Sequence, residues 1–247
     1  MSDMAIISAG FKHAPFIERA FKLNTHLRDK NFGYPFKIWI DSYPEGFDVE
    51  TMNPYLIKYY CIKEMIKEGY TKILWMDSSV RFWNSPDSIS TILDTVGSFL
   101  IQNGEDNLNE FSNDNFIETL KLTREEAKQI KIILGTVFGI NINSNYGSKI
   151  WQLYKLIAEN HPSVFDGDRF PHGFGDTSHE VKGHRNDQSV LSYICHMVGA
   201  IPTQETPVEG PWYYHNQHLS DNDTEYFPSD AVLISSDVII GERHWDK

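Results

Sequence analysis

Cysteine is scarce in this sequence of 247 residues. Cys61 and Cys195 are the only two, and each lies in a stretch whose apolar residues recur at helical spacing. This placement favours buried, reduced thiols over a disulfide framework or a zinc site. Such cysteine usage is typical of an intracellular protein, so we expect a cytoplasmic location.

Basic residues and long apolar runs are also in short supply. The chain has 22 lysines and arginines against 34 acidic residues, which gives a net charge of -12. Surfaces that bind nucleic acid or anionic lipid need clustered Lys and Arg, so this balance disfavours both partners. No segment approaches the ~18 apolar residues of a membrane span, and the first residues lack the pattern of a signal peptide. We expect no nucleic-acid partner and no integral membrane segment.

Hydrophobic residues make up 40% of the sequence and aromatic residues 13%, which is enough for one sizeable core. This length and composition predict a single domain over residues 1–247. The first 80 residues alternate between strand and helix patterns, with strands expected at 5–8, 36–40 and 73–76 and helices at 16–27 and 54–66. The run at 73–76 is continuously apolar, as expected where helices cover both faces of a parallel sheet. The predicted fold class is α/β, with a Rossmann-like, mostly parallel sheet flanked by helices.

The second half of the chain carries weaker signals. Thr123 to Glu126 forms a capping-box pattern that opens a short helix, and residues 134–142 read as an apolar strand. Further helices are expected at 150–157 and from an Asn186 N-cap to Gly199, with a last strand near 231–235. Between them Ser163–Arg185 holds four glycines and no apolar period, and a loop of that length is usually functional or mobile.

The predicted strands place three polar segments at one edge of the sheet. In a half-fold of this kind, ligands bind beyond the carboxyl ends of the strands, which here are residues 8–13, 41–43 and 77–81. Asp77 follows the buried strand directly, so it either forms a local turn or contacts a ligand. Position alone leaves both interpretations open.

Two further segments could carry chemistry. Asp187 and Gln188 open a predicted helix, where they either complement the helix dipole or face a pocket to hold sugar hydroxyls or serve a reacting group. The segment from Trp212 to His218 combines aromatic rings with two imidazoles, His215 and His218. Taken singly, each histidine is more often a surface residue than a ligand, but one of them with Asp77 would suit Mn²⁺. An acidic protein that binds an anionic ligand commonly uses a metal cation to supply positive charge.

Residues 55–85 and 184–191 together resemble the nucleotide-diphosphosugar glycosyltransferases of the GT-A fold. The resemblance implies a nucleotide-binding half over residues 1–100, and an acceptor half with a C-terminal tail over 101–247. It implies donor-nucleotide contacts by a set of residues near the strand ends: Ser8, Ala9, Gly10, Phe11, Asp41, Lys58 and Asp77. It implies sugar or acceptor contacts by Asp187 and Gln188. Beside the resemblance, we expect Trp212 to contact the sugar or acceptor and Asp187 to be the catalytic residue.

The same resemblance implies a divalent cation, Mn²⁺ or Mg²⁺, bound through an Asp-x-Asp motif. That motif falls on Asp77 and Ser79, with His215 or His218 completing the metal shell. Because Ser79 replaces the second carboxylate, either Asp77 holds the metal with a C-terminal histidine and the diphosphate, or the reaction is metal-independent.

We therefore expect transfer of a sugar from a nucleotide-diphosphosugar to a hydroxyl of a glycan, protein or small-molecule acceptor. A cation or Lys58 would neutralise the diphosphate, and Asp187 could assist deprotonation of the acceptor. One alternative is a sugar-nucleotide hydrolase or a nucleotidyltransferase, the latter disfavoured because no glycine-rich, basic loop follows the first strand. Another is a non-catalytic sugar-binding module with Trp212 in a stacking platform.

Overall fold

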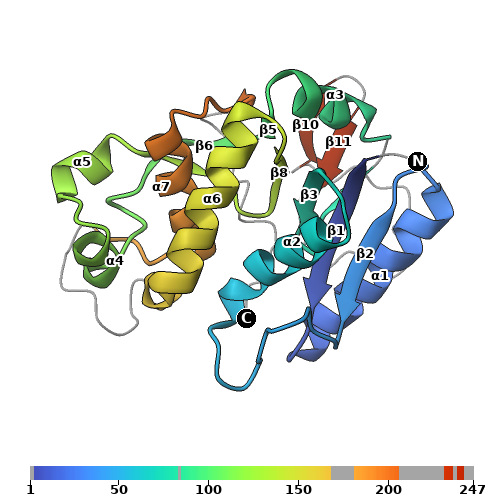
Figure 1. Ribbon diagram of the computed structural model, residues 1–247, viewed down its shortest axis with the longest axis horizontal. Coiled ribbons are helices and arrows are strands. Elements are labelled where there is room, and N and C mark those ends of the chain that lie inside the picture. The colour runs from blue at the N-terminus through green and yellow to red at the C-terminus, as the bar shows by residue number, and fades with distance from the viewer. Residues whose placement is uncertain (1–2, 83–84, 168–180, 206–230, 236–237, 242–247) are drawn as a thin grey trace.

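A five-stranded sheet with strand order β2-β1-β3-β8-β5 forms the centre of the computed structural model, which describes residues 3–82, 85–167, 181–205, 231–235 and 238–241 (Figure 1). Its strands are β1 (Met4–Gly10), β2 (Phe36–Ile40), β3 (Lys72–Met76), β5 (Ser98–Phe99) and β8 (Val137–Asn141). β1 pairs in parallel with β2 and β3, whereas β8 runs antiparallel to both β3 and β5. β5 therefore runs in the same direction as β1, β2 and β3. The predicted α/β class with a mostly parallel sheet is confirmed, with β8 running against the other strands.

Helices cover both faces of this sheet, as the apolar β3 strand predicts. They are α1 (Ala14–Lys30), α2 (Ile57–Lys67), α3 (Asp87–Thr95) and α6 (Asn145–Asn160), with a short 3-10 helix, η1 (Pro54–Leu56), leading into α2. Alternate β3 residues enter different cores, because successive side chains of a strand point to opposite faces. Ile73 and Trp75 pack with α2 and α6, whereas Leu74 and Met76 pack with α1 and α3.

A second group of elements lies beside the sheet, on the left of Figure 1. It comprises β6 (Ile101–Asn107), β7 (Lys131–Ile133), β9 (Gln204–Glu205), α4 (Asp114–Thr119), α5 (Arg124–Lys128), α7 (Asp187–Val198) and the 3-10 helix η2 (Pro162–Phe165). The predicted capping box is present, because Thr123 and Glu126 bond each other's backbone amides at the start of α5. α7 packs on β7 and α6, and its apolar side chains join the core that lies under α2.

The last described residues of the chain pair with a short strand that follows Asp77 in the sequence. β10 (Ala231–Ser235) and β11 (Val238–Gly241) form an antiparallel sheet with β4 (Arg81–Phe82). The strand predicted near 231–235 is confirmed. Its sheet brings Gly241 into register with Arg81 and Ile240 into register with Phe82.

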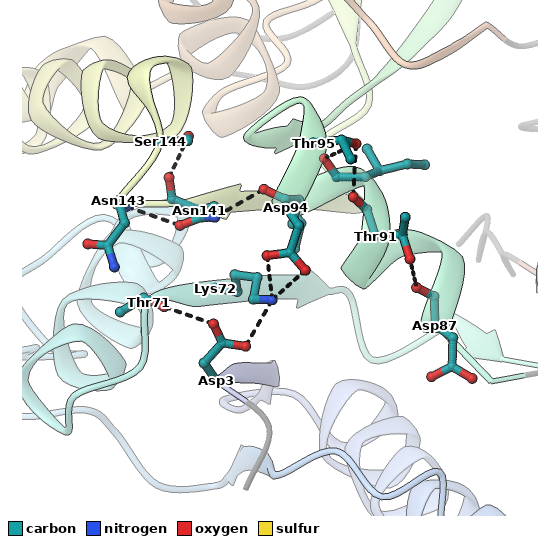
Figure 2. Close-up of polar contacts among 12 residues, drawn as sticks. Asp3, Thr71, Lys72, Asp87, Thr91, Asp94, Thr95, Asn141, Asn143 and Ser144 are labelled. Carbon is teal, nitrogen blue, oxygen red and sulfur yellow. Dashed lines mark hydrogen bonds and ion pairs between the residues drawn. The ribbon is translucent and has the colours of Figure 1, made fainter.

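The amino edge of β3 is closed by an ionic cluster (Figure 2). Lys72 at the start of β3 has an almost fully buried side chain, and its Nζ lies 2.7 Å from Asp94 of α3 and 2.9 Å from Asp3. Asn141, at the end of β8, donates to the carbonyl of Leu93 at 3.1 Å. These contacts fasten α3 to the amino edge of the sheet.

Both cysteines are buried free thiols, Cys61 in α2 and Cys195 in α7. Burial raises the pKa of each thiol, so both stay protonated at neutral pH. The prediction of reduced, structural thiols is confirmed. Among the helices of the described residues, none combines the length and apolar character needed to cross a bilayer.

Candidate active site

The carboxyl ends of β1, β2 and β3 meet at one edge because the three strands are parallel neighbours. Asp41 adopts a positive φ of 46° directly after β2, and its backbone N–H donates to the Gly10 carbonyl at 2.9 Å. Asp77 follows β3, and its N–H donates to the Thr136 carbonyl at 2.7 Å. The predicted strand-end segments therefore lie along the same edge.

Lys58 of α2 joins two carboxylates at this edge. Its Nζ lies 2.6 Å from Asp187 Oδ2 and 3.1 Å from Asp77 Oδ1, and it donates to the Gly135 carbonyl at 2.5 Å. The Lys58 and Asp187 side chains are only 9% and 10% exposed. An ammonium group has three protons, so these three acceptors satisfy it.

The charge state of Lys58 follows from its neighbours. Burial by itself lowers the pKa of a lysine, but the charges of Asp187 and Asp77 outweigh burial and raise the pKa of Lys58 above its ordinary value. Lys58 therefore stays protonated. One ammonium between two carboxylates leaves the cluster with a net charge of about -1 when both are ionised.

Asp77 is anchored through one of its oxygens. Trp75 Nε1 donates to Asp77 Oδ1 at 2.7 Å, and Lys58 contacts the same oxygen while lying 5.0 Å from the centre of the Trp75 ring. Within the described part of the chain, no hydrogen bond reaches Asp77 Oδ2. The side chain is 34% exposed, so a carboxylate oxygen is available to a hydroxyl or a cation.

Asp187 reaches the cluster from the first residue of α7. Gly135, in the connection from β7 to β8, allows this approach, since a Cβ there would lie 3.2 Å from Asp187 Oδ2 and 3.1 Å from the Gln188 Cβ. Gln188 is buried, and its Nε2 has no hydrogen-bond partner among the described residues. Asp187 and Gln188 thus lie at the junction of the central sheet and the second group of elements.

The predicted N-cap role of Asn186 is wrong, whereas the C-terminal Gly199 is confirmed in the left-handed conformation that ends α7. Asn186 makes no capping bond. Its Nδ2 instead donates to the carbonyls of Phe165 and Gly167, and its backbone has φ 45° and ψ -114°. An N-cap residue typically has φ and ψ in the β region, which Asn186 does not have.

The nucleotide-contact predictions fall on residues with different exposure. Ser8 is fully buried within β1, so its side chain is not open to a ligand, and Ala9 is partly buried. Phe11 is partly exposed and packs edge-on against Tyr43 at 5.6 Å. Asp41 is exposed beside it. Phe11 and Asp41 are thus the predicted donor contacts whose side chains a ligand can reach at this end.

Gly10 lies against a helix rather than open to a ligand. A Cβ at Gly10 would lie 2.2 Å from the Phe16 carbonyl oxygen and 2.6 Å from the Ala20 Cβ. The close packing of α1 on β1 therefore explains why a glycine stands here.

The predicted metal ligands are only partly described. Ser79 is partly exposed near Asp77, whereas His215 and His218 lie outside the described residues. So do the predicted sugar contact Trp212 and most of the Ser163–Arg185 loop. The described residues contain no cluster of three or more His, Cys, Asp or Glu side chains that could hold a metal ion. Asp77 and Ser79 alone do not complete such a site, because Mg²⁺ and related cations take about six ligands.

Two contributors to the site were not anticipated from the sequence. Trp75 was expected only as a core residue of its strand, yet its indole N–H fixes Asp77. Gly135 lay inside a predicted strand, whereas its carbonyl accepts from Lys58 in a connection between strands. A glycine between two apolar runs, Lys131–Ile133 and Val137–Asn141, was the signal that could have marked this connection.

No protein-family model matches the sequence, and no curated protein matches it. Several solved structures are similar to it in part, among them these two. One is a glycosyltransferase involved in the glycosylation of the major capsid of PBCV-1, with 14% identity, a TM-score of 0.35, and coverage of 65% of this chain and 77% of that chain. The other is a proposed glucose-1-phosphate thymidylyltransferase from Bacillus anthracis in complex with sucrose, with 11% identity, a TM-score of 0.38, and coverage of 82% and 67%. Both TM-scores are below 0.5, so these similarities carry no conclusion about function.

Proposed function

We propose that this protein transfers a sugar from a nucleotide-diphosphosugar to a hydroxyl acceptor. The observation that carries the proposal is the Lys58 bridge, which brings a strand-end carboxylate, Asp77, and a helix-start carboxylate, Asp187, to one edge of a mostly parallel sheet. Parallel sheets bind ligands at this edge, and a pair of fixed carboxylates can serve both hydroxyl binding and proton transfer.

In the proposed reaction, Asp187 accepts the proton of the acceptor hydroxyl. The acceptor oxygen forms a bond to the anomeric carbon, while the bond from that carbon to the donor diphosphate breaks and the nucleoside diphosphate leaves with the bonding electrons. Lys58 holds Asp187 in position through the 2.6 Å contact of its Nζ with Asp187 Oδ2. Proton acceptance by a positioned carboxylate is worth about 10²–10⁴-fold in rate.

We assign the nucleoside to the part of the edge lined by Phe11 and Asp41, with Asp77 nearer the diphosphate. The exposed carboxylate of Asp41 suits polar groups of the base or ribose, and the ring of Phe11 offers an apolar surface. Asp77 would offer its Oδ2 to a ribose hydroxyl or a cation, since Oδ1 is already bonded by Trp75 and Lys58.

A divalent cation fits this proposal on charge grounds. The Lys58 protons are engaged by Asp77, Asp187 and Gly135, so Lys58 is not a free positive charge for the leaving diphosphate. A bound Mn²⁺ or Mg²⁺ would supply that charge. Its proposed ligands are Asp77, Ser79 and either His215 or His218. A direct contact of Lys58 with the donor stays a prediction that would require one of its present bonds to open.

A thermal-shift screen tests donor binding. UDP-, GDP-, CMP- and dTDP-sugars are added with Mn²⁺, with Mg²⁺ or with EDTA, and a hundredfold excess of donor over its Kd stabilises the fold by about 2.7 kcal/mol. The donor that stabilises the protein is then incubated with hydroxyl acceptors. Transfer that requires an acceptor supports the proposal. Release of sugar to water alone indicates a hydrolase, exchange with pyrophosphate a nucleotidyltransferase, and binding without turnover a sugar-binding module.

Substitutions then separate the roles of the two carboxylates. Asp187→Asn should lower kcat at least about 100-fold with little change in melting temperature, because it removes a proton acceptor but keeps the shape. Asp77→Asn should abolish the donor-induced thermal shift. Asp29→Asn, an exposed carboxylate on α1, is the matched control and should change neither. Wild-type kcat in Asp187→Asn would contradict its role as the base.

A further inference from the structure

The residue that precedes α7 has an unusual backbone conformation. Asn186 combines φ 45° with ψ -114°, whereas Asn31, another asparagine with positive φ, has ψ 55° and lies in the ordinary left-handed region. Glycine adopts the Asn186 combination readily, but a residue with a Cβ is strained there by about 1–3 kcal/mol. Such strain persists only where surrounding contacts hold it.

The strained residue forms a tight turn that directs Asp187 into the site. The Gln188 N–H donates to the Arg185 carbonyl at 2.9 Å, which closes a four-residue turn with Asn186 at its second position. Asn186 has a positive φ and the following Asp187 does not, which is the pattern of a type II′ turn. The next residue is Asp187, whose Oδ2 lies 2.6 Å from Lys58 Nζ.

The contacts that hold the turn come from the Asn186 side chain. It is 1% exposed, and its Nδ2 donates to the Phe165 carbonyl at 2.8 Å and to the Gly167 carbonyl at 3.0 Å. A glycine at this position would relieve the backbone strain but would lose both donors. The side chain is therefore the part of Asn186 that fixes the turn.

The Phe165 carbonyl also connects this turn to the helix that carries Lys58. Asn53 Nδ2 also donates to the Phe165 carbonyl, at 3.1 Å, while Asn53 Oδ1 accepts the Tyr55 N–H and so caps η1, which leads into α2. Asn186 and Asn53 thus share one acceptor, and the elements that carry Asp187 and Lys58 are both fastened to Phe165.

We propose that Asn186 is a positioning residue, whose side-chain bonds to Phe165 and Gly167 hold the strained turn that sets Asp187 against Lys58. Its effect on turnover rests on the proposed transferase function. Its effect on the Asp187–Lys58 contact does not, so the two can be tested separately.

The test uses Asn186→Gly and Asn186→Asp in the full chain. Glycine can adopt the same backbone conformation but lacks the side-chain amide that donates both hydrogen bonds. Aspartate has nearly the same size but places carboxylate oxygens against two carbonyl oxygens. The first readout is the ¹⁵N NMR signal of the Lys58 ammonium group, which is observable when the group is buried and hydrogen-bonded. We expect this signal in the wild type and expect both variants to broaden or lose it. Asn31→Gly makes the same chemical change at an exposed positive-φ asparagine and should leave the signal intact.

The second readout is kinetic. We expect kcat of Asn186→Gly to fall at least 10-fold while KM for the donor changes less than about threefold, since the chemistry and not the nucleotide contacts is disturbed. A merely structural role would lower the melting temperature and leave both kcat and the Lys58 signal unchanged, which would overturn the proposal. The wild type could also prove to have no transferase activity while both Asn186 variants lose the Lys58 signal. That result would support the positioning role and contradict the proposed function.

Discussion

Gly10 illustrates how a single residue can be required for packing at the edge of the candidate site. A Cβ at this position would overlap the Phe16 carbonyl oxygen and contact the Ala20 Cβ at 2.6 Å, so Gly10→Ala forces α1 away from β1. Overpacking of this kind costs about 1–3 kcal/mol, and we expect the upper end because the nearest atom belongs to backbone. Urea unfolding measures the loss.

Gly33→Ala is the comparison for this prediction. A Cβ at Gly33 would meet no atom within 4 Å, although its φ of 78° makes alanine unfavourable by about 1 kcal/mol. If Gly10→Ala proves no more destabilising than Gly33→Ala, the packing explanation is wrong.

His184 makes the stability of the protein depend on pH. Burial lowers the pKa of His184 from 6.5 to about 4, and the neutral ring bonds the Val164 carbonyl through Nε2 at 2.9 Å. The unfolded chain takes up this proton near pH 6.5, but the folded chain does so only near pH 4. The stabilisation is therefore complete above pH 6.5 and decreases as the pH falls to 4, by about 3 kcal/mol in total.

Urea unfolding at pH 7, 5.5 and 4.5 tests this dependence. His184→Gln lacks the titrating ring, so the wild type should lose free energy of unfolding relative to this variant as the pH is lowered. His161 is exposed, and the free energy of unfolding of His161→Gln should change with pH as that of the wild type does. A constant difference between wild type and His184→Gln across this range would contradict the prediction.

At the scale of elements, the Lys72 cluster fastens α3 to the amino edge of the sheet (Figure 2). Burial lowers the pKa of Lys72, but bonds to Asp94 and Asp3 outweigh it and raise that pKa, so the ammonium is charged and paired. Either carboxylate alone still pairs with it. We therefore expect Asp3→Asn and Asp94→Asn each to cost at most about 1 kcal/mol, because both carboxylates are largely exposed.

The double variant should cost more than the sum of the two. Without either carboxylate, a buried ammonium is left unpaired, and breaking such a pair costs about 3–5 kcal/mol. A double-mutant cycle by urea unfolding gives the coupling directly. A small, additive loss would show that the two carboxylates do not substitute for each other.

At the scale of the whole molecule, one core joins the central sheet to the second group of elements. It contains Ile73 and Trp75 of β3, Ile133 of β7, and Val190 and Leu191 of α7. A continuous core should make the two parts unfold together, as the predicted single domain requires. Hydrogen exchange followed by mass spectrometry should give the same free energy of opening for peptides of β3 and of α7. A much lower value for α7 would indicate that the second group unfolds independently.

The sequence alone predicted the elements whose signals are local. The β2 bounds match the prediction, and η1 and α2 follow the Asn53-Pro54 signal, because a cap, a proline and an apolar period act within a few residues. The capping box of α5 and the glycine end of α7 belong to the same class. The short strands β5, β6 and β7 and the helix α3 were missed, since two to nine residues carry little periodicity of their own.

The sequence also placed Asp77 at a strand end and Asp187 at a helix start, but it did not show that one lysine joins them. That contact depends on α2 lying under β3, on the approach of α7 that Gly135 permits, and on the Asn186 turn. Each is a relation between segments far apart along the chain, which local propensity does not encode. The direction of β8 was likewise decided by its pairing with β3. The strand ends and helix starts were thus determined by the sequence, whereas the packing of the tertiary structure decided which of them meet.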